Sequence, residues 1–145
     1  MKKILFLFIF SPFLFFSQEK VKSENYFDDL TLEERRIIVQ KGTEKASSGI
    51  YNKHFEEGIY ICKACNNPLF RSEAKFKSNC GWPSFDDEIK GSIAKYPDYS
   101  YGVKRTEICC ANCNGHLGHV FEGENFTKMN IRHCVNSLSI KFLKN

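Results

Sequence analysis

The sequence predicts a single, mainly β domain with antiparallel strands, one or two short N-terminal helices and a structural metal site. After Gly42 the chain consists of short β-type runs separated by Gly, Pro, Asn and Asp, and only one stretch, just before Gly42, has the end signals of a helix. Two Cys-x-x-Cys pairs stand 44 residues apart. A length of 145 residues with 42% hydrophobic content suits one domain with a core and is too short for two.

Residues 1–17, MKKILFLFIFSPFLFFS, have the layout of a secretory signal peptide, in which lysines precede an apolar run and polar residues follow it. The apolar run is shorter than the roughly 20 residues that span a bilayer. We therefore expect cleavage after Ser17 and export to the periplasm or the exterior; the alternative is a membrane anchor made by the uncleaved segment. Residues 18–29 form a polar lead-in, and the domain occupies residues 30–145.

The charge balance argues against a nucleic-acid partner. The whole chain has a net charge of +4, and removal of residues 1–17 takes away Lys2 and Lys3 and no acid, which leaves +2. The basic residues are scattered among acids and form no concentrated basic run. We expect them to be solvated surface.

The segment TLEERRIIVQKG, residues 31–42, predicts the helix. Thr31 is the expected N-cap, Glu34 completes a capping box three positions later, and Gly42 is the expected stop. The apolar positions expected to pack against the rest of the domain are Leu30, Leu32, Ile37 and Ile38.

Six later segments predict strands, at residues 58–62, 68–70, 92–96, 101–110, 119–123 and 134–142. The last of them, CVNSLSIKF, alternates strictly and predicts one continuous strand. On such a strand Cys134 and Asn136 share a face and lie about 7 Å apart, at the end of a face that becomes wholly apolar. A thiol and an amide at the edge of a core are typical of a small pocket.

The two Cys-x-x-Cys pairs predict a metal site. Four thiolates at this spacing suit tetrahedral Zn²⁺, as in zinc ribbons, and a closed four-thiolate site would join distant parts of a small β domain. One alternative is a thioredoxin-type redox pair, for which the βαβ context is missing; another is a ligand set that takes His116, His119 or Cys109 in place of one cysteine. The expected ligands are Cys62, Cys65, Cys110 and Cys113.

Cys80 and Cys134 are left for chemistry. Arg132, two residues before Cys134, is a candidate for lowering the pKa of that thiol so that a nucleophilic thiolate forms; the alternative is an ordinary buried strand cysteine. Cys80 is a second thiol that could condense with an oxidised Cys134. His116 and His119, in a loop expected to be held by the metal, could donate hydrogen bonds to a polar substrate oxygen.

From about Val39 to Phe142 the chain resembles the peptide-methionine (R)-S-oxide reductases. The matching motifs, in the family's order, are GTE at 42–44, Cys-x-x-Cys at 62 and 110, CGWPSF at 80–85, CANCNGHLGHVF at 110–121 and RHCVNS at 132–137. The resemblance implies two antiparallel sheets, a structural zinc ion remote from the chemistry, and residues 30–145 as the catalytic domain.

The resemblance also implies an activity, the thiol-dependent reduction of the R epimer of peptide-bound methionine sulfoxide in the repair of oxidised proteins. Cys134 would be the nucleophile and form a sulfenic acid, which Cys80 would resolve as a disulfide. A thioredoxin-like donor, itself exported, would reduce that disulfide, and we expect the enzyme to be a monomer.

The remaining site residues follow from the same resemblance. Polar groups would orient the sulfoxide oxygen, and a rigid indole would pack against the substrate's S-methyl group. The residues implied for orienting the oxygen are His116, His119 and Asn136. Arg132 would lie near the nucleophile, and Trp82 and Phe121 would contact the substrate.

Two other classes of protein compete with this hypothesis. A zinc-ribbon binding module would have no reaction of its own, but it has no need for the pair Cys80 and Cys134. A secreted domain held by disulfides would use its cysteines in bridges, and both the odd count of seven and the close Cys-x-x-Cys spacing argue against it.

Overall fold

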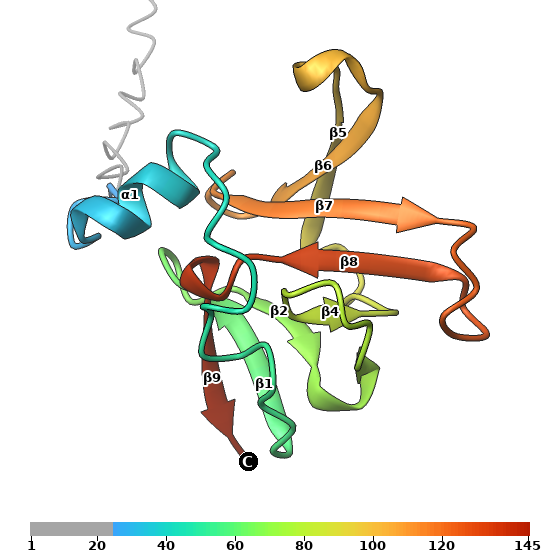
Figure 1. Cartoon of the computed structure of the whole chain (residues 1–145). Helices are drawn as coiled ribbons and strands as arrows, with labels where there is room; N and C mark the ends of the chain where they lie inside the picture. Colours follow the sequence, from blue (N-terminus) through green and yellow to red (C-terminus); the bar gives the residue numbers. More distant parts are fainter. Residues whose placement is uncertain (1–24) are drawn as a thin grey trace, which may run out of the picture.

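The computed structural model describes residues 25–145 and has two antiparallel sheets and one helix, as the sequence predicts (Figure 1). The predicted signal peptide at residues 1–17 and most of the polar lead-in lie outside the described residues. Within residues 25–145, no helix combines the length and the apolar character needed to cross a membrane.

The three-stranded sheet has the order β2-β1-β9, and the six-stranded sheet has the order β3-β4-β8-β7-β6-β5. Neighbouring strands in both sheets are antiparallel. The elements are α1 (Leu32–Ile38), β1 (Gly58–Cys62), β2 (Pro68–Arg71), β3 (Lys75–Phe76), β4 (Ser84–Phe85), β5 (Ile93–Asp98), β6 (Arg105–Cys110), β7 (His116–Glu122), β8 (Ile131–Val135) and β9 (Ile140–Lys144).

Helix α1 has the predicted capping box, with Thr31 and Glu34 each bonding the other's backbone N–H. Two details of the prediction are wrong. The helix ends at Ile38 rather than at Gly42, and Leu32 is 89% exposed. Leu32 lies five and six residues before the buried Ile37 and Ile38, and at 3.6 residues per turn that places it on the opposite, solvent face.

The predicted continuous strand at residues 134–142 is also wrong. β8 ends at Val135, a 3-10 turn covers Ser137–Ser139, and β9 then pairs with β1 in the other sheet. The carboxylate of Glu44 accepts hydrogen bonds from the backbone N–H groups of Ser137 and Leu138, which stabilises this turn. Alternation of residue types cannot show such a change of sheet, because it persists on both sides of the turn.

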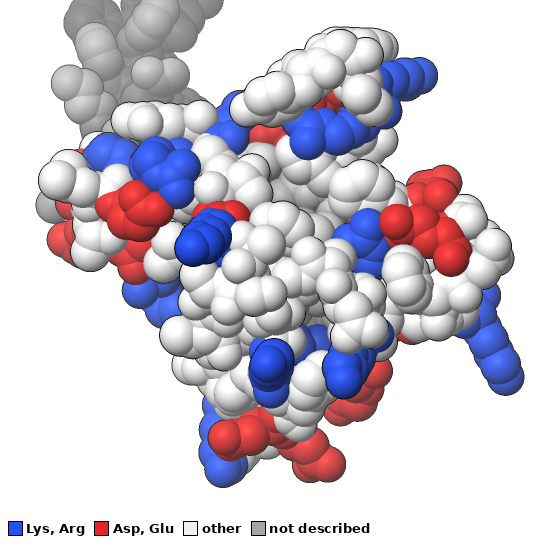
Figure 2. Space-filling model, in the orientation of Figure 1, with Lys and Arg blue, Asp and Glu red and all other residues white. Residues whose placement is uncertain are grey.

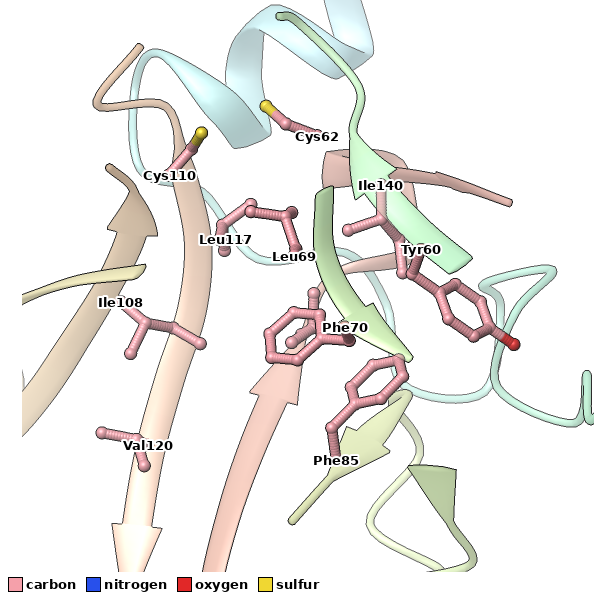
Figure 3. Packing of buried hydrophobic residues seen from close by; sticks show 11 residues of the cluster. Tyr60, Cys62, Leu69, Phe70, Phe85, Ile108, Cys110, Leu117, Val120 and Ile140 are labelled. Atoms are coloured by element: carbon pink, nitrogen blue, oxygen red, sulfur yellow. The ribbon is translucent and has the colours of Figure 1, made fainter. Parts of the chain in front are cut away.

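The hydrophobic core lies between the two sheets (Figure 3). The rings of Phe70 on β2 and Phe85 on β4 stack with centroids 4.3 Å apart, and Tyr60 on β1 meets Phe85 at 5.0 Å. β3 and β4 have only two residues each, so they carry no periodic signal and are not predicted by the pattern of residue types. Cys62 and Cys110 lie together at one end of this core.

Candidate functional site

The two Cys-x-x-Cys pairs form two matching turns. Asn66 and Asn114, which follow the second cysteine of each pair, have φ of 62° and 60°, a left-handed conformation that Asn tolerates better than most residues. In each turn the Asn N–H returns to the first cysteine's carbonyl, at 3.0 Å for Asn66 to Cys62 and 2.8 Å for Asn114 to Cys110. This folding brings both thiols of each pair to the same side.

The two turns face each other, so the four sulfur atoms form one cluster, and every pair of them is separated by 4.8 Å or less. The Sγ atoms of Cys62 and Cys113 are 3.6 Å apart, and those of Cys65 and Cys110 are 3.5 Å apart. A tetrahedral ion with metal–sulfur bonds of about 2.3 Å sets its sulfurs about 3.8 Å apart, so the residues fit such an ion. The ion would join β1 of one sheet to β6 of the other.

A separate cavity of about 140 Å³ opens beside Cys134 on β8. Several of the residues that the sequence and the family resemblance single out line it together. They are Trp82, His119, Phe121, Cys134 and Asn136, and the cavity is completed by Thr43, Arg105, Gly118 and Val135. The pocket predicted around Cys134 and Asn136 is therefore present, although Asn136 follows the end of β8 instead of continuing it.

The approach of β7 to β8 sets the floor of this cavity. His119 is the residue directly opposite Cys134 in the strand register, and Gly118 is opposite Val135. A Cβ atom on Gly118 would lie 2.0 Å from the carbonyl oxygen of Cys134, so only glycine permits this approach. The half-buried indole of Trp82 is oriented by a hydrogen bond from Nε1 to the carbonyl of Glu44, at 3.2 Å.

His119 belongs to a charged network at the mouth of the cavity. Its Nε2 lies 2.8 Å from Oδ2 of Asp98, which also accepts a hydrogen bond from Arg105 at 2.7 Å. Hydrogen bonds from Ser100, together with His119 and the charge of Arg105, hold the pKa of Asp98 well below its usual range. Asp98 stays ionised and orients the imidazole. No motif in the sequence points to Asp98 or Arg105 as site residues.

His116 is 2% exposed and lies behind His119, with ring centroids 5.7 Å apart. Both histidines lie on β7, which begins three residues before the strand predicted at residues 119–123, so the loop expected for them is absent. Nδ1 of His116 lies 2.8 Å from Oε1 of Glu107. Burial lowers the pKa of His116, and the carboxylate of Glu107 opposes this only in part, so the imidazole is neutral at neutral pH.

Cys80 meets Cys134 because β4 pairs with β8, with Ser84 opposite Cys134. The two Sγ atoms are 3.9 Å apart. The hydrogen bond from Cys134 lowers the pKa of Cys80 to about 4, against the effect of burial and with help from the hydroxyls of Ser78 and Ser84. The same hydrogen bond, with burial, raises the pKa of Cys134. The two thiols thus share one proton, and the resting negative charge lies on Cys80.

Arg132 lies near this pair, and its charge lowers the pKa of Cys134 without overcoming Cys80 and burial. Its guanidinium makes two hydrogen bonds to the carboxylate of Glu124, at 2.7 and 2.8 Å, and lies 4.5 Å from the centre of the Phe121 ring. Arg132, His116 and Cys80 are not among the residues that line the cavity. Thr43 and Glu44 belong to the GTE motif at residues 42–44, and no role at the site is predicted for them.

Acidic and basic side chains are both scattered over the face seen in Figure 2, among larger areas of other residues, and neither sign forms one continuous patch there.

Comparison with known proteins agrees with the motifs. The family model described as SelR domain matches residues 30–144. Two relatives from Arabidopsis thaliana, both named peptide methionine sulfoxide reductase, are B2 (chloroplastic), 54% identical over 114 residues, and B5, 53% identical over 114 residues. The match covers 78% of this chain in each case, 55% of the B2 protein and 81% of the B5 protein. The chain therefore belongs to the SelR domain family, that of the peptide methionine sulfoxide reductase B enzymes.

Proposed function

We propose that this protein reduces the R epimer of peptide-bound methionine sulfoxide, with Cys134 as nucleophile and Cys80 as resolving thiol. The observation that carries the proposal is the position of the two sulfurs, 3.9 Å apart, at a cavity that also presents an indole, an imidazole and an amide. A closed metal-binding module would need none of these groups.

The first step begins when the proton shared by the two thiols lies on Cys80, which leaves Cys134 as the thiolate. The Cys134 sulfur forms a bond to the sulfoxide sulfur while the sulfoxide oxygen takes up a proton. Collapse of this adduct transfers the oxygen, so that methionine leaves and Cys134 becomes a sulfenic acid. The proton on the sulfoxide oxygen comes from solvent, and Cys80 keeps its own proton until the second step.

In the second step the sulfur of Cys80 attacks the sulfenic sulfur of Cys134. The S–O bond breaks, water leaves with the thiol proton, and a disulfide forms. Two electrons and two protons from a thioredoxin-like donor restore both thiols. Ser78 and Ser84 support this step because their hydroxyls hydrogen-bond to the Cys80 sulfur and hold it toward Cys134.

The walls of the cavity have separate tasks in this proposal. Trp82 provides an apolar face for the S-methyl group, and Phe121 extends that face. His119, fixed by Asp98, and the buried Asn136 face the position of the sulfoxide oxygen, and their hydrogen bonds orient it. His116 supports His119 from behind, and the cation of Arg132 favours negative charge on Cys134.

We also propose that the four-cysteine cluster holds Zn²⁺. Its all-thiolate ligand set, matching turns and sulfur separations suit this ion, which would leave no open coordination position and would serve only to join the two sheets. Residues 1–17 resemble a signal peptide, so we propose that the protein is exported and that its thioredoxin-like donor is exported too. We also propose oxidised proteins or peptides as substrates and a monomeric enzyme.

The test is to incubate the purified, reduced protein with dithiothreitol and the separated R and S epimers of a blocked methionine sulfoxide. Methionine should form from the R epimer alone, as followed by chromatography. Lack of turnover of either epimer by fully reduced, zinc-replete protein would refute the proposal.

A further inference from the structure

Glu107, Cys109 and His116 form a second cluster of metal-ligating side chains. Their donor atoms lie within 4.8 Å of one another, and all three residues are buried. The Sγ atom of Cys109 is 3.4 Å and Nδ1 of His116 is 2.8 Å from the same carboxylate oxygen of Glu107. Thiolate, imidazole and carboxylate are the three kinds of ligand that Zn²⁺ takes in proteins.

The sheet places these groups together at an irregularity in the register of β6 and β7, between Ile108 and Cys109. Cys109 and His116 are opposite each other in the register of β6 and β7, and Glu107 lies two positions before Cys109 on the same strand. Cys110, the next residue, belongs to the four-cysteine cluster. One strand therefore contributes neighbouring residues to two separate groups of ligands.

A path from solvent and a suitable charge are also present. A cavity of about 560 Å³ is bounded by Lys41, Glu107, His116 and His119, among other residues. The ammonium of Lys41 lies 2.8 Å from Glu107, and the Lys41 side chain is 61% exposed, so it can turn into solvent. One thiolate and one carboxylate then balance the charge of a divalent ion.

We propose that Glu107, Cys109 and His116 bind a Zn²⁺ ion that enters through this cavity and inhibits the enzyme by holding His116. Binding releases the thiol proton of Cys109 to solvent and displaces the Lys41 ammonium from Glu107. The binding stands on the cluster itself, whereas the inhibition rests on the function proposed above.

Binding is tested in the Cys80→Ser/Cys134→Ser protein, where the reactive pair cannot capture metal. Competition with a chromophoric zinc chelator should reveal two equivalents of Zn²⁺, and addition of Cys109→Ser should leave one. Lys41→Met should tighten the second equivalent, because the competing ammonium is gone. The site would be overturned if the protein with Cys109 intact bound only one equivalent of Zn²⁺, or if the Cys109→Ser protein still bound two. An unchanged affinity for the second Zn²⁺ in Lys41→Met would also overturn it.

A spectroscopic measurement covers the case in which Cys109→Ser folds poorly. With Zn²⁺ in the four-cysteine cluster, added Co²⁺ should give thiolate-to-metal absorption in the Cys80→Ser/Cys134→Ser protein, since Cys109 is then the one cysteine outside the cluster. Absence of that absorption contradicts the site.

Inhibition is tested separately, in single-turnover reduction by the Cys80→Ser protein. Zn²⁺ should slow this turnover, and the further change Cys109→Ser should leave the basal rate unchanged while removing the slowing. Equal inhibition of both proteins would overturn the regulatory role. Lack of turnover in metal-free buffer would instead count against the proposed function, while the metal titration would still decide the site.

Discussion

The carboxylate of Glu44 caps a turn that begins at Ser137, 93 residues further along the chain. The carboxylate accepts a hydrogen bond from the backbone N–H of Ser137 at 2.6 Å and another from that of Leu138 at 3.1 Å. The backbone N–H of Glu44 donates to the side-chain oxygen of Asn136. Its carbonyl receives the Trp82 indole. One residue thus connects the loop before β1 to the turn after β8 and to the wall of the cavity.

Glu44→Ala should lower the free energy of unfolding by an amount on the order of 2–4 kcal/mol, because the buried N–H of Ser137 and the partly buried N–H of Leu138 lose their acceptor. It should also lower kcat, because the carboxylate contacts fix the position of the residue 44 backbone, whose N–H and carbonyl bond Asn136 and Trp82. Chemical denaturation and steady-state kinetics measure the two effects. The exposed Glu57→Ala is the matched control, and equal stability of the two variants would show that the capping contact adds nothing.

Cys134→Ser should abolish even a single turnover and leave the bound metal unchanged, because the nucleophile is lost and the metal cluster is separate. Cys80→Ser should complete one turnover and then stall with thioredoxin as donor. Rapid-quench detection of methionine, with metal content measured in parallel, distinguishes them. Retained turnover in Cys134→Ser would exclude Cys134 as nucleophile, and undiminished recycling in Cys80→Ser would assign resolution to another thiol.

The lowered pKa of Cys80 predicts a thiolate that persists in mild acid. An ordinary thiol, with a pKa of about 8.5, loses roughly tenfold in thiolate per pH unit below that value, whereas a thiol with a pKa of about 4 remains ionised at pH 5 and above. Alkylation of Cys80 by iodoacetamide, read by mass spectrometry, should therefore change little between about pH 5 and 8. In Cys134→Ala the rate of Cys80 alkylation should fall in acid, because the hydrogen bond from Cys134, the largest cause of the low pKa of Cys80, is missing.

Gly118→Ala should disturb the pairing of β7 and β8 beside Cys134. The new methyl group would lie 2.0 Å from a backbone oxygen, which predicts a loss on the order of 3 kcal/mol in the free energy of unfolding and a fall in activity. Gly91→Ala is the control: its φ of +77° is unfavourable for alanine, but no atom lies within 4 Å, so it should cost only about 1–2 kcal/mol. Similar losses in both variants would remove the steric argument.

Removal of the metal should loosen the contact between the two sheets. Chelation leaves four thiols close together without an ion, and Cys65→Ser leaves three. In both cases the stabilisation by metal binding is lost. We expect a lower melting temperature, measured by circular dichroism, and recovery in the wild-type protein when Zn²⁺ is returned. A melting temperature that chelation does not change would show that the cluster carries no structural metal.

Local patterns in the sequence were sufficient for the capping box of α1, for most strands and for the metal cluster. Each depends on residues close in the chain: Thr31 with Glu34, or Cys62 with Cys65. The grouping of Trp82, His119 and Cys134 was also available, but only through motifs shared with a family, since no short-range pattern relates these positions.

The break after β8 and the resting charge on Cys80 depended on the tertiary structure. The turn at Ser137 exists because a carboxylate from a distant loop satisfies its N–H groups, and the pKa of Cys80 depends on hydrogen bonds from Cys134, Ser78 and Ser84. The second cluster, with Glu107, Cys109 and His116, likewise needs the register of two paired strands. The sequence by itself determined the capping box, most of the strands and the residue types of the site. The fold decided which groups lie within hydrogen-bond distance, and such short-range forces set both protonation and ligation.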